Sequence, residues 1–130
     1  MDAVELTARR EALGLASGDL ARLLQWEADT VVRFESGGQG IPAEVDQKLD
    51  ELEFARDTIA GVLEDTLPGD LPTFATEEAF WAAWPQMRGV PVWIHRIAAA
   101  DALRSAKWAG IPARIVLAGP ATAERRPATL

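Results

Sequence analysis

The chain has 130 residues, of which 48% are hydrophobic and 25% are charged, so its composition predicts a globular protein with a modest core. It contains no cysteine, which excludes disulfide bonds and thiolate metal sites. The start, Met1-Asp2-Ala3-Val4-Glu5, lacks the features of a signal peptide, and no apolar stretch reaches the roughly 18 residues of a membrane span. We therefore expect a cytoplasmic protein.

The net charge of −7 is unevenly distributed. Residues 1–55 contain five basic and twelve acidic residues, whereas residues 56–130 contain eight of each. All of the excess negative charge therefore lies in the first part of the chain, where it opposes binding to phosphates.

Three short helices and one long helix are predicted in the first half. Apolar spacing predicts helices over residues 3–13, 18–24 and 28–36. Ser17 has the hydroxyl of an N-cap for the second of these helices. Four residues, Gly37-Gly38-Gln39-Gly40, end the third.

The fourth helix is predicted to begin near Pro42 and to end at Pro68. Its apolar seam consists of Val45, Leu49, Leu52, Ile59, Leu63 and Leu67. This seam is longer than a domain over residues 1–55 needs, so we expect a second chain to help bury it.

The rest of the chain has a different composition, with four of the five tryptophans. It is predicted to contain strand 71–75, helix 76–84, loop 85–91, helix 93–109, strand 113–118 and a frayed end over 121–130. We interpret Trp81, Trp84, Trp93 and Trp108 as core and interface anchors.

The segment from Leu13 to Gly37 resembles the XRE or Cro/cI-type helix-turn-helix family. The resemblance lies in Leu13-Gly14-Leu15, in the Leu-Ala-x-Leu-Leu pattern from Leu20, in Thr30-Val31 and in Phe34-Glu35-Ser36-Gly37. It implies a mainly α fold, a λ-repressor-like helix-turn-helix bundle with a small α/β C-terminal extension. The expected parts are a DNA-binding domain over 1–55, a long-helix continuation with an α/β dimerisation region over 56–120, and a flexible tail over 121–130.

In that family the third helix enters the major groove of double-stranded DNA. The residues that the resemblance places at DNA are Ala28, Asp29, Thr30 and Arg33, with Val32 beside them, and Ser17 at a phosphate. Arg10 and Glu35 match a pair that commonly forms a salt bridge between the first and third helices, a structural role.

The chain departs from the family pattern at several positions on this surface. Gln25 stands where the family usually has a glycine in a left-handed conformation, and Glu27 stands where an N-cap serine or threonine is usual. Ala28 and Asp29 replace basic or amide residues, although a carboxylate can accept from cytosine. The alternative interpretation is therefore an acidic helix-turn-helix-fold module that has lost DNA binding and binds a protein partner.

The pattern of Phe34–Gly37, the long fourth helix and the tail segment around His95 is similar to a small repressor group that includes the anti-CRISPR-associated autoregulators. This resemblance implies a transcriptional regulator, a repressor that binds a pseudo-palindromic operator as a dimer. We expect a homodimer held mainly by residues 57–118.

No enzymatic constellation can be assembled from the sequence. His95 is the single histidine, and without cysteines it does not make a zinc site. Ser105 lies on the same predicted helix as His95 but on a different face, so the two cannot act together. We interpret His95 as a partly buried structural residue beside Trp93. The sequence therefore predicts no catalytic residue, no metal and no cofactor.

Overall fold

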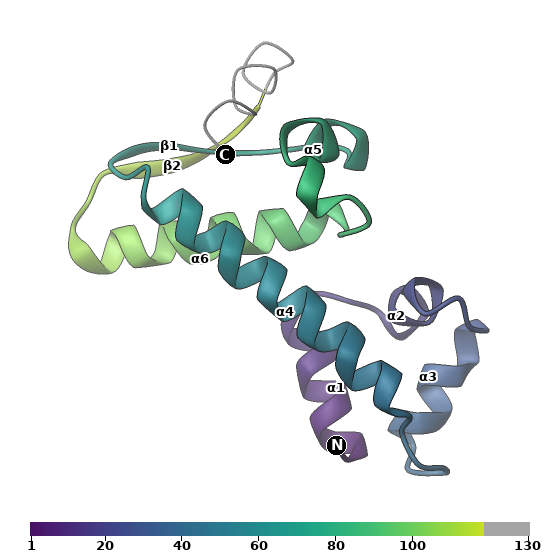
Figure 1. The fold of residues 1–130 in the computed structure, drawn as a ribbon. Helices are drawn as coiled ribbons and strands as arrows, with labels where there is room; N and C mark the ends of the chain where they lie inside the picture. Colours follow the sequence, from purple (N-terminus) through teal and green to yellow (C-terminus); the bar gives the residue numbers. More distant parts are fainter. Residues whose placement is uncertain (119–130) are drawn as a thin grey trace. The chain divides into compact units, whose positions relative to one another are not determined.

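A computed structural model describes residues 1–118, and the predicted tail 121–130 lies outside this range. The chain is mainly helical and has a small two-stranded parallel sheet, so the predicted mainly α class is confirmed (Figure 1). It divides into two compact units, Met1–Glu53 and a second that begins at Phe54. None of the described helices is both long and apolar enough to cross a membrane.

The first unit contains α1 (Ala3–Ala12), α2 (Ser17–Leu23), α3 (Ala28–Glu35) and the start of α4 (Ala43–Glu64). Its buried apolar side chains come from all four helices and from the loop after α1: Leu6, Leu13, Leu15, Leu20, Val31, Phe34, Val45, Leu49 and Leu52. The predicted helices are therefore present, and their apolar faces form the core of this unit.

Helix α2 begins one residue earlier than predicted, and Ser17 is not its N-cap. The N-cap is Ala16, which has no side-chain acceptor, and the Asp19 carboxylate accepts the backbone N–H of Ala16 at 2.9 Å. The acid in the first turn thus fixes this end of the helix, and Ser17 becomes its first helical residue.

An acidic cluster on α4 surrounds one arginine of α1. The Arg9 guanidinium contacts Glu53 at 2.7 Å, Asp46 at 2.5 Å and Asp50 at 2.9 Å. Hydrogen bonds to Glu53 and Asp46 raise the pKa of Arg9 above its usual value. A quarter of the acidic residues in residues 1–55 therefore serve to tie α1 to α4.

The second unit contains the rest of α4, β1 (Gly69–Thr73), α5 (Glu77–Ala83), the 3-10 turn η1 (Pro85–Met87), α6 (Val92–Ala109) and β2 (Ala113–Leu117). Strands β1 and β2 are parallel, with Gly69 opposite Ala113 and Thr73 opposite Leu117, and α6 contacts both (Figure 1). Strand β1 begins two residues before the predicted strand, because Gly69 adopts a positive φ of 123° and still pairs.

The apolar seam of α4 is buried within this chain. Leu52, Ile59 and Leu63 are at most 3% exposed. In the second unit, α6 lies against α4 through an ion pair of Arg56 with Asp101 at 2.7 Å and a hydrogen bond from Ser105 to Glu64 at 3.0 Å. The expectation that a second chain must bury the seam is therefore wrong for its residues from Val45 to Leu63, which are buried in the single chain, whereas Leu67 is half-buried.

His95 is a structural residue, as predicted, but it is fully buried where partial burial was expected. It is 1% exposed, its Nδ1 lies 2.9 Å from the Thr73 hydroxyl, and Phe74, Phe80 and Trp84 contact its ring. These contacts join α6 to β1 and α5, so the histidine contributes to packing of the second unit.

Candidate nucleic-acid interface

A tight turn connects α2 to α3, and Gln25 is the residue of this turn that adopts the left-handed conformation. Its φ is +60°, as the resemblance of residues 13–37 implied for this position. The Gln25 N–H donates to Arg22 O at 3.0 Å and the Trp26 N–H donates to Ala21 O at 2.8 Å, the two bonds of a Schellman motif. These bonds fix the direction in which the chain leaves α2 and enters α3.

Packing of aromatic rings fixes α3 at the other side of this turn. The Trp26 and Phe34 rings lie 5.6 Å apart between centroids, with 58° between their planes. Val31 and Phe34 are buried against the core, and α3 contacts α1 and α2. Helix α3 is therefore held on one side only, which leaves its opposite face free.

That opposite face contains four of the six predicted site residues. Ala28, Asp29, Val32 and Arg33 are exposed, and Val32 is 51% exposed although it is apolar. Thr30 is half-buried and lines, with Ala28, an open hollow of about 590 Å³ at the start of α3. Ser17 lies apart from them on α2 and is half-buried.

Arg33, the single base of α3, is paired along the helix with Asp29. Its Nη1 lies 3.0 Å from the Asp29 carboxylate, with side-chain exposures of 55% and 70%. An exposed pair at i,i+4 contributes only about 0.3–0.5 kcal/mol, so a phosphate or a guanine edge can replace Asp29 as the partner of Arg33.

The predicted salt bridge between Arg10 and Glu35 is confirmed. Two bonds of 2.7 and 2.9 Å join the guanidinium to the carboxylate, which also accepts from the Thr7 hydroxyl at 2.9 Å. Hydrogen bonding to Arg10, followed by that to Thr7, lowers the pKa of Glu35 against the effect of burial. The pair fixes the end of α3 to α1 and supplies no free charge to the surface.

The charge near α3 is smaller than the total for the first unit suggests. Arg10 neutralises Glu35, and Arg9 of α1 contacts three acids of α4, which are Asp46, Asp50 and Glu53. What is left on α2, the turn and the exposed face of α3 is two bases, Arg22 and Arg33, against three acids, Asp19, Glu27 and Asp29.

Two residues of this surface were missed at the level of sequence. Gln25 is exposed and lines the same hollow as Thr30, so its amide is available beside the N-terminus of α3. Arg22 has a side-chain exposure of 75% and only a 3.4 Å contact with Asp19. The sequence signal that could have identified them is a long polar side chain, on the second helix for Arg22 and at the left-handed turn position for Gln25.

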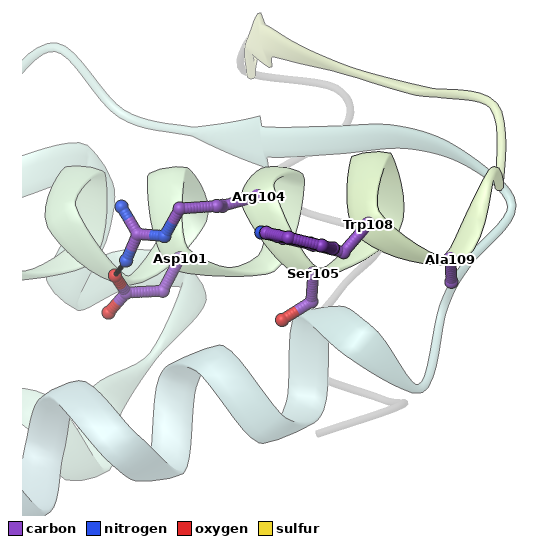
Figure 2. Close-up of a pocket in the computed structure, with 5 residues that line it drawn as sticks. All are labelled: Asp101, Arg104, Ser105, Trp108 and Ala109. Carbon is purple, nitrogen blue, oxygen red and sulfur yellow. Dashed lines mark hydrogen bonds and ion pairs between the residues drawn. The ribbon is translucent and has the colours of Figure 1, made fainter.

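A second hollow, in the second unit, has no comparable chemistry. Figure 2 shows Asp101, Arg104, Ser105, Trp108 and Ala109 along α6, with Arg104 bonded to Asp101. Both Asp101 oxygens are held by Arg56 and Arg104, and the Ser105 hydroxyl donates to Glu64 at 3.0 Å, so these groups pair with one another. Over residues 1–118, no group of three histidine, aspartate or glutamate side chains could hold a metal ion.

The chain matches no known protein-family model, and no curated protein matches it.

Proposed function

We propose that this chain is a sequence-specific DNA-binding transcriptional regulator of the λ-repressor-like (XRE, Cro/cI-type) helix-turn-helix class. The role proposed is that of a dimeric repressor at a pseudo-palindromic operator. Repression, as distinct from activation, rests on the resemblance of residues 13–37 and of the tail to known repressors.

The observation that carries the proposal is the α2–turn–α3 geometry. A left-handed Gln25 closes a Schellman turn, α3 is packed on one side, and its other face has Ala28, Asp29, Val32 and Arg33 exposed together. A helix held in this way can enter the major groove with its first residues at base edges.

In this mechanism Arg33 exchanges Asp29 for a guanine edge or a phosphate, and Val32 lies against a thymine methyl group. Thr30 and Gln25 supply neutral hydrogen-bonding groups at the start of α3, and Ser17 is available to a phosphate at the start of α2. Because the surface has few bases, affinity depends on specific contacts more than on release of counterions.

The test is a titration of the purified protein against genomic fragments and random DNA at several salt concentrations. Arg33→Ala is expected to weaken specific binding at least tenfold, consistent with about 1–3 kcal/mol for a bidentate contact to guanine. Arg96→Ala removes an exposed arginine from the second unit and is expected to leave binding unchanged.

Asp29→Asn supplies the opposite perturbation. It removes the acid that holds Arg33 at 3.0 Å, so we expect stronger nonspecific binding. If the wild-type protein binds no genomic fragment even at low salt, the proposal that it is a DNA-binding regulator is refuted.

The second candidate is a protein-interaction module. It is favoured by Glu27 and Asp29, two exposed acids at the start of α3 that repel phosphates. On this alternative, Asp29→Asn weakens capture of a basic protein partner, and Arg33→Ala changes no DNA-dependent signal.

A further inference from the structure

The two-stranded sheet of the second unit has one edge suited to further pairing, which belongs to β2. The Gly69 N–H donates to Pro112 O at 3.0 Å, and the Ala118 N–H donates to Thr73 O at 2.8 Å. Since successive residues of a strand direct their backbone groups to alternate sides, Ala113, Ile115 and Leu117 direct theirs away from β1.

The opposite edge of the sheet is closed to such pairing. By the same alternation, the outward residues of β1 are Asp70 and Pro72. Proline has no backbone N–H, so this edge offers a single outward donor, that of Asp70.

Within its own five residues, β2 has little of the protection that usually blocks an exposed edge. Its one charged residue, Arg114, is bonded to Asp70 at 3.0 Å, and it contains no proline. Ile115 and Leu117 are 37% and 66% exposed, which is high for apolar residues of a strand. Natural proteins usually block such an edge with charges or proline unless another strand covers it.

We propose that β2 pairs in antiparallel orientation with β2 of a second copy of this chain, about a twofold axis that passes between the two Ile115 residues. The resulting sheet has four strands in the order β1-β2-β2-β1. This interface would form the dimer of the regulator proposed above, and its biological role rests on that function.

A second copy fits this edge because the edge is complementary to itself. With Ile115 opposite Ile115 of the second copy, Ala113 lies opposite Leu117, and every outward N–H and C=O of these three residues gains a partner. The large, exposed Leu117 faces the smallest side chain of the strand. Each Arg114 keeps its own Asp70, so no unpaired like charges meet.

The closed edge of β1 limits the assembly to two chains. A sheet that could pair at both of its edges would propagate into a fibre, whereas Pro72 leaves each chain with one edge that can pair. The predicted dimer through residues 57–118 thus acquires a specific contact, different from the seam of α4.

The test measures the association of the full chain by sedimentation as a function of concentration. Ile115→Lys and Ile115→Glu each place two like charges face to face on the axis, and we expect each to raise the dimer dissociation constant at least about a hundredfold. An equimolar mixture of the two variants is expected to restore the dimer, because Lys then faces Glu.

Phe54→Lys is the matched control, because Phe54 is 73% exposed on α4 and lies outside β2. It is expected to leave the dimer intact. Leu117→Lys repeats the test at a side chain already 66% exposed, and circular dichroism reports whether each variant is folded.

A wild-type chain that is monomeric at all concentrations overturns the interface, as does a folded Ile115→Lys variant that dimerises normally or a mixture that fails to recover. These measurements contain no DNA. A dimer that binds no operator would refute the regulator and leave the interface standing, and a monomer that binds DNA would do the reverse.

Discussion

The Arg10–Glu35 pair offers a direct measure of what holds α3 in place. Both side chains are 13–14% exposed, and the carboxylate accepts three hydrogen bonds, from Arg10 twice and from Thr7. Hydrogen bonds to charged groups contribute about 1.5–3 kcal/mol each to the stability of the folded protein. Removing one partner of a buried pair costs about 3–5 kcal/mol. With some solvent access, we expect Glu35→Ala to lower the free energy of unfolding by about 2–3 kcal/mol.

Glu27→Ala is the control, because Glu27 is exposed and makes no side-chain cap bond. Surface changes of this kind usually stay within about 0.5 kcal/mol, with up to about 1 kcal/mol more from the helix dipole. Urea denaturation followed by circular dichroism at pH 7 gives both values. Equal losses for the two variants would show that the pair does not anchor α3.

The pH dependence of Glu35 follows from the direction of its shift. Hydrogen bonding to Arg10 lowers the pKa of Glu35 in the folded protein. The stability from the ionised carboxylate is therefore complete above the unfolded pKa of about 4.3 and is lost as the pH falls through the lower folded pKa. The difference between wild type and Glu35→Gln is expected to shrink over that acidic range and to stay constant above it.

Two further predictions concern single positions. Gln25→Gly is expected to raise the free energy of unfolding by about 0.5–1 kcal/mol, because glycine adopts the +60° φ without strain; Gln25→Ala keeps the strain, so an equal gain with alanine would contradict this account. Thr73→Val is expected to lower it by about 1–3 kcal/mol, because the buried His95 Nδ1 loses a partner at 2.9 Å; Thr73→Ser keeps the hydroxyl, and thermal melts in which serine is worse than valine would argue against the hydrogen bond.

Much of the first unit follows from local signals in the sequence. Apolar periodicity gives the helices, and the family resemblance of residues 13–37 implied the left-handed residue at position 25 in the turn before α3. The start of α2 was misjudged by one residue because a serine and an aspartate two residues apart compete to fix the same helix end.

Long-range pairings were harder to foresee. Nothing local in Gly69-Asp70 or in Ala113-Arg114 indicates that these segments lie side by side. The seam of α4 was recognised, but its burial within the single chain was not, because an apolar stripe does not show which segment packs against it.

The candidate site was predicted in its positions more than in its electrostatics. The exposure of Ala28, Asp29, Val32 and Arg33 follows from the helical period, once Val31 and Phe34 face the core. The summed charge of residues 1–55 overstated the problem at α3, because a total cannot show that Arg9 and Arg10 already hold four of the acids.

The parallel sheet also determines the order in which the protein can be completed during synthesis. Asp70 and its cross-strand partner Arg114 are separated by 44 positions of chain, whereas the helices of the first unit are joined by contacts within its own 53 residues. Domains tend to fold from the N-terminus as they emerge, and local contacts form faster than distant ones. The surface that presents α3 is therefore ready while β1 still lacks a neighbour, and the outer edge of β2 is among the last features to be made. A growing chain thus acquires α3 before it can acquire its sheet.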